Sequence, residues 1–464
     1  MVFFKQRLPE FIKKLFRKIV GLFPVNLTLG RKYWKIRNFI DQSESFSKNE
    51  IDAYQLKKIK EIVNYAYENV PGYRMLYEQE NLKPKDLQSL NDFKFFPTVS
   101  KELIRDNLKD FTSTKISIFF NKEFTSTGGS SGIPFGFYRT KISNYSEPAY
   151  IHSGWKRSGW KVNNKSIVLR GEFVGSRDNF SYFNEKTREL SLSSYYLTQE
   201  TYEDYIKKIS KKDFKYLHAY PSSASIFADL IIENDDCGKF PFEIILLGSE
   251  NIYNFQIEKI KKAFPLSKIN HWYGHSEQAI LAQICEFSDN YHISPTYGYA
   301  EILDSNFNEV SKGFSGKLVG TSFWNYATPF IRYVTDDIAQ KGEFGCSKCG
   351  RKHQLINKIE GRKQEVVISK TGRYISMAAM NMHTDVFKNV AQFQFFQQEE
   401  GKIDLKIIPK KDFTVKDELK IYEEVKKKLG EGFRLDIKLT DKINLTSSGK
   451  YRFLEQKLVL KYGE

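Results

Sequence analysis

Short apolar segments alternate with helical ones through the middle of this chain. "KSIVLRG" (165–171), "KYLHAYPSS" (215–223), "FEIILLGSE" (242–250) and "SKINHWYGHSE" (267–277) each begin as a strand, and helical patterns separate them. Strands that alternate with helices at this spacing predict a mainly parallel sheet, whose ligands bind beyond the carboxyl ends of the strands. Several of these ends carry small or polar residues, so we expect the functional site at that edge.

The pattern changes to β beyond residue 300, where 316–323 and 328–340 predict strands, and the last hundred residues run β-β-α-β. With 464 residues the chain is too long for one compact core. We therefore predict an α/β fold with two domains. A large N-terminal domain over 1–360 has mainly parallel sheets and a β-rich subdomain, and a small, mobile α+β domain covers 361–464.

The chain is basic, with a net charge of +16 that suits anionic partners such as nucleotides, nucleic acid or an anionic membrane surface. Its first 23 residues place apolar side chains on one helical stripe and basic ones on the other, which fits either a peripheral helix at the inner membrane face or a helix packed on its own domain. No apolar run of transmembrane length and no secretory pattern occur, and four cysteines are too few for a disulfide framework. We expect a cytoplasmic protein.

The segment "TSTGGSSGIP" (125–134) combines three glycines with five hydroxyl side chains. It matches the G-x-S-x-G elbow of serine hydrolases literally, but that elbow and the Walker A loop both require a helix after the last glycine. Here Ile133 and Pro134 lead into a predicted strand over 135–140, and another predicted strand precedes the loop. A phosphate cradle between two strands and a flexible surface turn are the interpretations that stay open.

Three further segments carry chemistry-bearing side chains. "YVTDD" (333–337) offers carboxylates suited to ribose hydroxyls, and "YGHSEQA" (273–279) offers a ring for stacking on a base and a carboxylate for Mg²⁺. "LTSSGKYRF" (445–453) places a lysine in a Gly/Ser turn. Each segment alone is equally compatible with a structural role.

Together and in this order, the segments resemble the motifs of the adenylate-forming enzyme superfamily. The most similar branch contains the phenylacetate–CoA ligases and their relatives in capsular-polysaccharide loci. The glycine-rich loop resembles T-S-G-[ST]-[ST]-G-x-P, "YGHSE" resembles Y-G-x-[ST]-E, and "YVTDD" resembles Y-x-T-G-D. "GSE" (248–250) is similar to the family's adenine-side strand, "EGR" (360–362) to its hinge, and "SSGKYR" (447–452) to its S-G-K-x-x-R.

This resemblance implies an ATP-dependent, AMP-forming ligase that makes an acyl-adenylate with release of pyrophosphate and then transfers the acyl group to an acceptor. It assigns the ATP phosphates to Thr125, Ser126, Thr127, Gly128, Gly129, Ser130, Ser131 and Gly132. It assigns adenine to Gly248, Ser249, Glu250, Tyr273 and Gly274, and the ribose to Asp337 and Arg362. It assigns the α-phosphate to Ser276, Mg²⁺ to Glu277, and the substrate carboxylate and α-phosphate to Lys450, which a rotation of the small domain then removes.

The acid and the acceptor stay open. The resemblance favours the thiol of CoA as acceptor, with an amine on an amino sugar or amino acid, used in surface polysaccharide assembly, as the alternative. His218, Tyr220, Pro221 and His275 are expected to line the acyl pocket. The oligomeric state is also open, with a homodimer as one candidate. The chain departs from the family where Asp336 replaces a glycine and where Gln364 replaces an aspartate common at the hinge.

The cysteines suggest a second kind of site. Cys346 and Cys349 form a C-x-x-C pair, and Cys285 and His292 precede it by some fifty residues. Three thiolates and one imidazole complete a closed tetrahedral zinc site, which is structural rather than catalytic because it leaves no open position. Unligated thiols are the alternative. A basic, zinc-containing nucleic-acid-binding protein is a rival class, but the basic residues are scattered and no nucleic-acid-binding motif occurs, so we expect no nucleic-acid partner.

Overall fold

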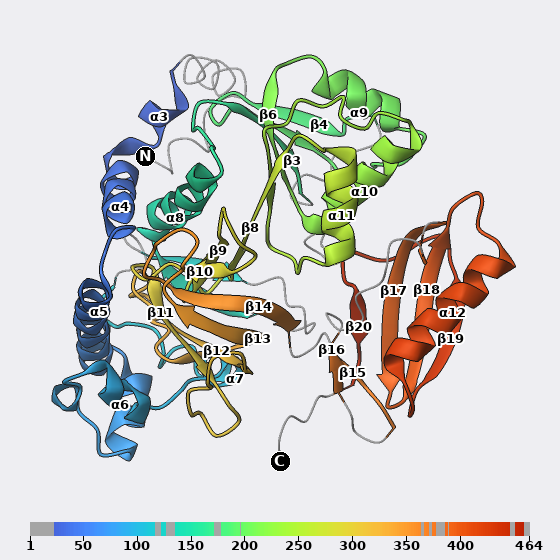
Figure 1. The fold of residues 1–464 in the computed structure, drawn as a ribbon. Coiled ribbons are helices and arrows are strands. Elements are labelled where there is room, and N and C mark those ends of the chain that lie inside the picture. Colours follow the sequence, from blue (N-terminus) through green and yellow to red (C-terminus); the bar gives the residue numbers. More distant parts are fainter. Residues whose placement is uncertain are drawn as a thin grey trace.

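The computed structural model describes residues 23–116, 122–126, 135–170, 178–194, 196–362, 366–370, 374–376, 386–387, 389–445 and 451–458. Its first helices lie along one side of the molecule (Figure 1). They are α3 (Val25–Thr28), α4 (Gly30–Ser43), α5 (Lys48–Asn69) and α6 (Pro71–Gln79), and α7 (Lys101–Asp106) follows later in the chain. Within the described ranges, no helix combines the length and the hydropathy needed to cross a bilayer.

Twelve strands form one sheet, in the order β11-β12-β13-β14-β10-β9-β8-β7-β6-β3-β5-β4. The strands are β3 (Lys165–Leu169), β4 (Ser181–Asn184), β5 (Glu189–Leu192), β6 (Phe214–Ala219), β7 (Ile244–Leu247), β8 (Lys268–Gly274), β9 (Leu281–Ile284), β10 (Tyr291–Ile293), β11 (Gly298–Leu303), β12 (Ser315–Ser322), β13 (Tyr333–Phe344) and β14 (Gln354–Arg362). Neighbours from β5 through β3, β6 and β7 to β8 pair in parallel, and β8 pairs antiparallel with β9. The pairing therefore changes direction at β8.

Helices cover both faces of the parallel half, as the strand–helix alternation predicts. They are α8 (Ser143–Arg157), α9 (Tyr202–Ile209), α10 (Pro221–Glu233) and α11 (Asn254–Ala263). In β7, Ile245 and Leu247 pack into the cluster that contains side chains of α9, α10 and α11, whereas Ile244 and Leu246 pack toward α4 and α8. Successive side chains of a strand point to opposite faces, so a wholly apolar strand such as β7 must be buried on both. The predicted α/β fold is confirmed.

The C-terminal part forms a smaller sheet beside the rest of the chain (Figure 1). Its order is β19-β18-β17-β20, from β17 (Val390–Glu399), β18 (Lys402–Pro409), β19 (Arg434–Leu439) and β20 (Leu454–Gln456). Helix α12 (Val415–Leu429) packs on it through Ile421, Val425 and Leu429. Two hairpins, β1 (Lys122–Ser126) with β2 (Gly136–Thr140) and β15 (Val366–Ile368) with β16 (Tyr374–Ser376), lie outside both sheets.

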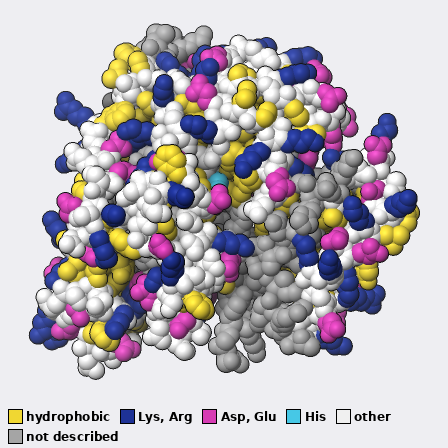
Figure 2. Space-filling view, in the orientation of Figure 1, with side chains coloured by type: hydrophobic (Ala, Val, Ile, Leu, Met, Phe, Trp, Pro, Cys, Tyr) yellow, Lys and Arg dark blue, Asp and Glu magenta, His cyan; other side chains and the backbone are white. Residues whose placement is uncertain are grey.

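The Ser100 hydroxyl accepts the Leu103 backbone N–H at 3.1 Å and so caps the start of α7. The predicted domain boundary between residues 360 and 361 falls inside β14, two residues before that strand ends. The division into 1–360 and 361–464 stays a prediction. On the face that Figure 2 shows, Lys and Arg side chains are scattered among acidic ones over many elements.

Candidate active site

The carboxyl ends of β3, β6, β7 and β8 lie along one edge of the sheet because these strands are parallel neighbours. Arg170, which follows β3, joins two of the other ends. Its Nη2 donates to the Ser249 hydroxyl at 2.9 Å, and its guanidinium lies 4.9 Å from the centre of the Tyr220 ring. Ser249, predicted for adenine, and Tyr220, predicted for the acyl group, therefore both lie beside Arg170 at this edge.

The loop after β7 is tightly constrained. A Cβ atom at Gly248 would lie 2.6 Å from the Trp272 ring, so this position accepts only glycine without a shift of the indole. Ser249 adopts φ of 68°, in the left-handed region that non-glycine residues rarely occupy. A close backbone approach and a left-handed residue in succession hold the loop in one shape, which suits a surface that contacts a flat ligand.

Glu250 turns its carboxylate toward helix α10. Its Oε2 accepts the Ser222 backbone N–H at 3.0 Å, and its Oε1 accepts the Ser222 hydroxyl at 3.1 Å and the Tyr451 backbone N–H at 3.2 Å. Ser222 lies in the first turn of α10, whose free N–H groups favour a negative charge. Glu250 was expected to contact adenine, and that contact stays a prediction.

The predicted ribose residues are neighbours. The Tyr273 hydroxyl donates to Asp337 Oδ2 at 2.6 Å, which joins the end of β8 to β13. Asp337 stands directly opposite Arg362 in the β13–β14 ladder, although the Arg362 side chain is outside the described part of the structure. The extra acid at Asp336 does not crowd this pair, because alternation along β13 sends its side chain the other way, to within 3.8 Å of Lys101 Nζ.

Glu277 is a buried carboxylate between two donors. Tyr333 donates its hydroxyl to Oε1 at 3.0 Å, and His275 Nδ1 lies 3.1 Å from Oε2. The Ile280 N–H donates to His275 Nε2, so the proton that His275 shares with Glu277 is on Nδ1. Burial raises the pKa of Glu277, but the hydrogen bond and electrostatic attraction from His275, together with hydrogen bonds from the Glu277 backbone N–H and the Tyr333 hydroxyl, outweigh it and lower this pKa to about 2.

The surroundings of Glu277 fit a hard cation. The carboxylate is ionised, and among the described side chains His275 and Tyr333 are its hydrogen-bond partners. Carboxylate oxygens are the protein ligands that Mg²⁺ prefers. Ser276, which precedes Glu277, is exposed and accessible to a ligand.

The residues predicted for the acyl pocket are only partly together. The His218 ring packs against both Trp155 and Trp272, with centroid distances of 5.0 and 5.6 Å, and burial and the nearby Arg170 charge hold its pKa well below the usual value. The His218 side chain therefore presents an uncharged aromatic ring. Tyr220 is 2% exposed and Pro221 is the first residue of α10. An acyl pocket lined by these residues and His275 stays a prediction.

Two predicted elements of the site cannot be located. Thr125 and Ser126 end β1, but Thr127, Gly128, Gly129, Ser130, Ser131 and Gly132 lie outside the described residues, as does Lys450. Conversely, sequence reasoning missed Arg170 and Tyr333, which bind Ser249 and Glu277. Each had a signal: Arg170 directly precedes the glycine at the end of a predicted strand, and Tyr333 opens the "YVTDD" segment.

A second cluster contains the four predicted metal ligands. Potential ligand atoms of Cys285, His292, Cys346 and Cys349 all lie within 4.8 Å of one another. Cys285 follows β9, His292 lies in β10, and the two other cysteines lie between β13 and β14. Pairing of β10 with both β9 and β14 brings these segments together. The C-x-x-C pair and its distant partners therefore meet because of the sheet order.

The distances in this cluster match a tetrahedral zinc site. The Cys285 and Cys346 sulfurs are 3.9 Å apart, and Cys349 Sγ lies 3.5 Å from His292 Nε2. Bonds of about 2.3 Å to sulfur and about 2.0–2.1 Å to nitrogen at tetrahedral angles give ligand separations of about 3.8 Å and about 3.5–3.6 Å. Leu281, at the start of β9, pairs with Gly274 near the site, and Cys285 follows the other end of β9. The cluster is therefore remote from the candidate active site.

Comparisons with known proteins show which families and folds this chain is similar to. Residues 367–457 match the family model of the CapK C-terminal domain. The phenylacetate–coenzyme A ligase of Aromatoleum evansii is 24% identical over 338 residues, which cover 71% of this chain and 74% of the relative. That of Thermus thermophilus is 22% identical over 373 residues, covering 78% and 81%. A 2-hydroxyisobutyryl-CoA ligase in its postadenylation state, 17% identical, superposes with a TM-score of 0.72 over 90% of this chain and 91% of that one.

Proposed function

We propose that the chain is an ATP-dependent, AMP-forming ligase, because its sequence is similar to phenylacetate–coenzyme A ligases and its fold to that of a 2-hydroxyisobutyryl-CoA ligase. It activates a carboxylic acid as an acyl-adenylate and passes the acyl group to an acceptor, with the thiol of CoA as the first candidate. The observation that carries the proposal is the strand edge where Tyr273 binds Asp337 and where the ionised Glu277 lies a few residues further along the chain.

The reaction explains the residue types at this edge. One oxygen of the substrate carboxylate attacks the α-phosphorus of ATP, the bond to the bridging oxygen breaks, and pyrophosphate leaves with the electron pair. The acceptor thiol then attacks the acyl carbonyl and AMP leaves. Little covalent chemistry falls to the protein, so positioning and countercharge supply the catalysis. Asp337 and Tyr273 would hold the nucleoside, and Lys450 would orient the two reacting groups.

Two metals belong to the proposal. Mg²⁺, when bound, would neutralise phosphate charge, and the buried, ionised Glu277 supports such a site. Zinc at Cys285, His292, Cys346 and Cys349 would be structural, and it would tie the β9–β10 hairpin to the β13–β14 turn. The chemistry of three thiolates and one imidazole, together with their tetrahedral separations, supports zinc over the oxygen-loving cations.

Several finer points of the proposal depend on experiment alone. An amine acceptor in capsular or other surface polysaccharide assembly is the alternative to CoA. The cytoplasmic location, the membrane contact of the first 23 residues and a homodimer stay predictions. The rotation of the C-terminal part between the two half-reactions is proposed from the family resemblance, since Lys450 must leave before the acceptor can approach the carbonyl.

The deciding experiment measures acid-dependent exchange of pyrophosphate into ATP, with Mg²⁺ and a mixed panel of carboxylic acids. Lys450→Ala should lower the exchange by about 10²–10³, the usual cost of one transition-state charge partner. Lys442→Ala is the matched control, because Lys442 is an exposed lysine eight positions earlier in the same region. CoA and amines are then supplied as acceptors, and the product, thioester or amide, distinguishes the two classes.

Each outcome decides something. Exchange with one class of acid, lost in Lys450→Ala and kept in Lys442→Ala, supports adenylation and names the donor. If ATP does not bind to the wild type, the ligase proposal fails. If both lysine variants lose exchange equally, the role assigned to Lys450 is wrong.

A further inference from the structure

The geometry points to Arg351 as a positioning residue of the predicted zinc site. The four potential ligands, Cys285, His292, Cys346 and Cys349, are called the Cys/His cluster below. The Arg351 guanidinium connects the two chain segments that supply these ligands and ties them to the end of helix α4. This inference rests on the proposed zinc site and adds to it a residue that would not itself touch the metal. By fixing the ligands, Arg351 would raise the affinity for zinc, and zinc would reciprocally stabilise the docking of α4.

The two segments of the Cys/His cluster meet beside Arg351. One segment is the turn between β13 and β14, which carries Cys346 and Cys349, and the other follows β9 and carries Cys285. The Arg351 carbonyl accepts the Cys346 backbone N–H at 2.8 Å. The backbone of Arg351 therefore closes the turn that carries two of the ligands.

The Arg351 side chain reaches the other segment. Its Nη1 and Nη2 donate to the two carboxylate oxygens of Glu286 at 2.9 and 2.7 Å. Glu286 directly follows Cys285, so this bidentate pair joins the neighbour of one ligand to the turn that carries two others. The side chains of Arg351 and Glu286 are only 17% and 16% exposed, so water screens their attraction less than at an open surface.

The third nitrogen of the guanidinium contacts helix α4. Arg351 Nε donates to Glu44 Oε2, and Arg157 Nη2, at the end of α8, donates to Glu44 Oε1 at 2.6 Å. Glu44 is the C-cap residue of α4, where the helix dipole disfavours a negative charge. The two arginine partners, and not the helix, therefore explain an acid at this position. Through Glu44, Arg351 connects the Cys/His cluster to the N-terminal helices.

Charge also favours an arginine at this place. Zn²⁺ bound by three thiolates and one neutral imidazole leaves one net negative charge on the site. Glu44 and Glu286 add two further negative charges, and Arg351 contacts both carboxylates. Without the guanidinium, the two carboxylates and the loaded cluster would repel one another. A lysine would restore the charge but could not bind both carboxylates in the same way, because it lacks the planar fork of donors.

The test replaces Arg351 by methionine, which keeps an unbranched side chain and removes the charge and the donors. Lys352→Met is the matched control, because Lys352 is the next residue, is exposed and loses the same charge. Arg351→Lys is the conservative variant. The apparent zinc affinity of each full-length protein is measured at one pH by competition with a chromophoric chelator, and the thermal midpoint of each protein is recorded.

We expect the zinc affinity to fall about 10- to 100-fold in Arg351→Met, the usual effect of losing a residue that orients metal ligands. The loss should be about 3- to 10-fold in Arg351→Lys, and less than about threefold in Lys352→Met. Unchanged affinity in Arg351→Met, or an equal loss in Arg351→Met and Lys352→Met, would overturn the inference. If Arg351→Met does not fold, wild-type affinity in folded Arg351→Lys would overturn it.

Hydrogen exchange tests the connection to α4 without any activity. In the wild type, removal of zinc should speed the exchange of the backbone amides at residues 40–43, the last turn of α4. Glu44→Ala removes both acceptors of the arginine bonds, so the same amides should exchange alike with and without zinc. If these amides do not respond to zinc in the wild type, or respond equally in Glu44→Ala, the connection to α4 is refuted.

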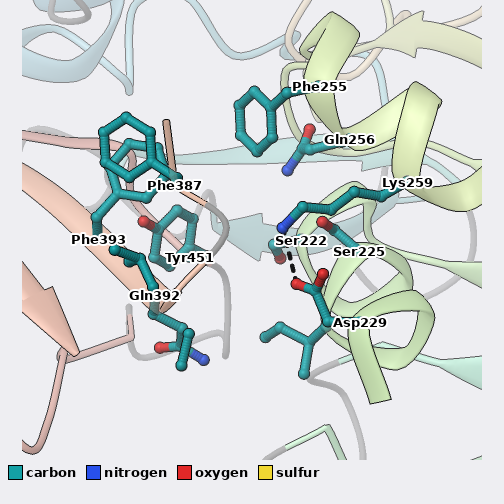
Figure 3. A pocket seen from close by; sticks show the side chains of 13 residues that line it. Ser222, Ser225, Asp229, Phe255, Gln256, Lys259, Phe387, Gln392, Phe393 and Tyr451 are labelled. Carbon is teal, nitrogen blue, oxygen red and sulfur yellow. Dashed lines mark hydrogen bonds and ion pairs between the residues drawn. The ribbon is translucent and has the colours of Figure 1, made fainter. Parts of the chain in front are cut away.

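The cleft between α10–α11 and the C-terminal sheet provides an internal control. Phe387, Phe393 and Tyr451 face Phe255 and Lys259 across this cleft (Figure 3). Among the described residues that line it, none belongs to α4, α8 or the Cys/His cluster. Amides of α10 and α11 should therefore exchange at the same rate with and without zinc. Faster exchange there as well would mean that zinc removal loosens the whole fold, which would refute a specific connection to α4.

The zinc site and the role of Arg351 can fail separately. If the wild type binds no zinc, the zinc site is wrong and the role of Arg351 is wrong with it. If the wild type and Arg351→Met bind zinc equally well, the zinc site stands and only the role of Arg351 is wrong. Neither result depends on pyrophosphate exchange, so the ligase proposal is tested independently.

Discussion

The carboxylate of Glu277 gives the most quantitative prediction. Its pKa falls from 4.5 to about 2 because the hydrogen bond and electrostatic attraction from His275, with hydrogen bonds from the Glu277 backbone and from Tyr333, outweigh the effect of burial. At about 1.4 kcal/mol per pH unit, this difference means that the fold favours the ionised carboxyl by about 3 kcal/mol. Glutamine has the shape of the protonated acid. Glu277→Gln should therefore lower the free energy of unfolding by about 3 kcal/mol at pH 7.

The pH dependence follows from the sign of the change. A carboxyl whose folded-state pKa is depressed contributes its full stability above the unfolded value of 4.5, and this contribution is lost as the pH falls toward about 2. The difference between wild type and Glu277→Gln should thus be constant from pH 6 to pH 8 and shrink below pH 4.5.

Urea unfolding of the wild type, Glu277→Gln and Tyr333→Phe measures these energies. Tyr333→Phe removes one of the two side-chain donors, so it should cost about 1.5–3 kcal/mol, no more than the loss of the charge itself. A cost for Glu277→Gln below about 1 kcal/mol would refute the reasoning, since the donors would then not stabilise the ionised form. Pyrophosphate exchange by Glu277→Gln should fall by about 10²–10³ if the Glu277 carboxylate also supplies a metal ligand.

Three further predictions concern the rest of the molecule. Purified protein should contain one zinc ion per chain by elemental analysis. Cys346→Ser should lose this zinc, while Cys237→Ser, a change at an exposed cysteine outside the cluster, should retain it. Equal zinc contents in the two variants would show that the Cys/His cluster is not the zinc site. Burial lowers the pKa of His152 to about 3, so the folded state loses stability as the pH falls below about 6.5. His152→Gln should therefore reduce the slope of the unfolding free energy against pH, between pH 4 and pH 6, by about 1.4 kcal/mol per pH unit. Arg332 donates from Nε and Nη2 to the buried Glu301 at 3.0 and 2.9 Å. Glu301→Gln and Arg332→Met should therefore each lower the free energy of unfolding by about 3–5 kcal/mol. The double variant should lose less than the sum of the two single losses, and strict additivity would show that the two charges are not coupled.

Much of the fold could be predicted from local pattern. The short apolar segments indicated strands, and the helical patterns between them indicated parallel pairing. The order of the motifs indicated the resemblance to the adenylate-forming enzymes, because each motif is a short contiguous segment. The four members of the Cys/His cluster were also singled out, since a C-x-x-C pair is a recognisable motif and one histidine and one cysteine stood some fifty residues earlier.

The contacts that define the site could not be predicted from the sequence. Nothing near Glu250 indicated that its carboxylate would bind Ser222 and Tyr451, which lie 28 and 201 residues away. The sequence placed an acid at Glu277 but could not show its pKa, because that value depends on burial and on a tyrosine 56 residues distant.

The sequence by itself determined the elements and the chemical types at the strand ends, since hydrophobic period, turn residues and motif spacing are local properties. Only the tertiary structure decided which of those side chains meet. The sheet order brings β8 beside β9 and β13 beside β14, and so joins Tyr273 to Asp337 and sets Asp337 opposite Arg362. These contacts join residues that are far apart in the sequence. Many alternative strand pairings are sterically allowed over such separations, and only the burial of a common core selects one of them.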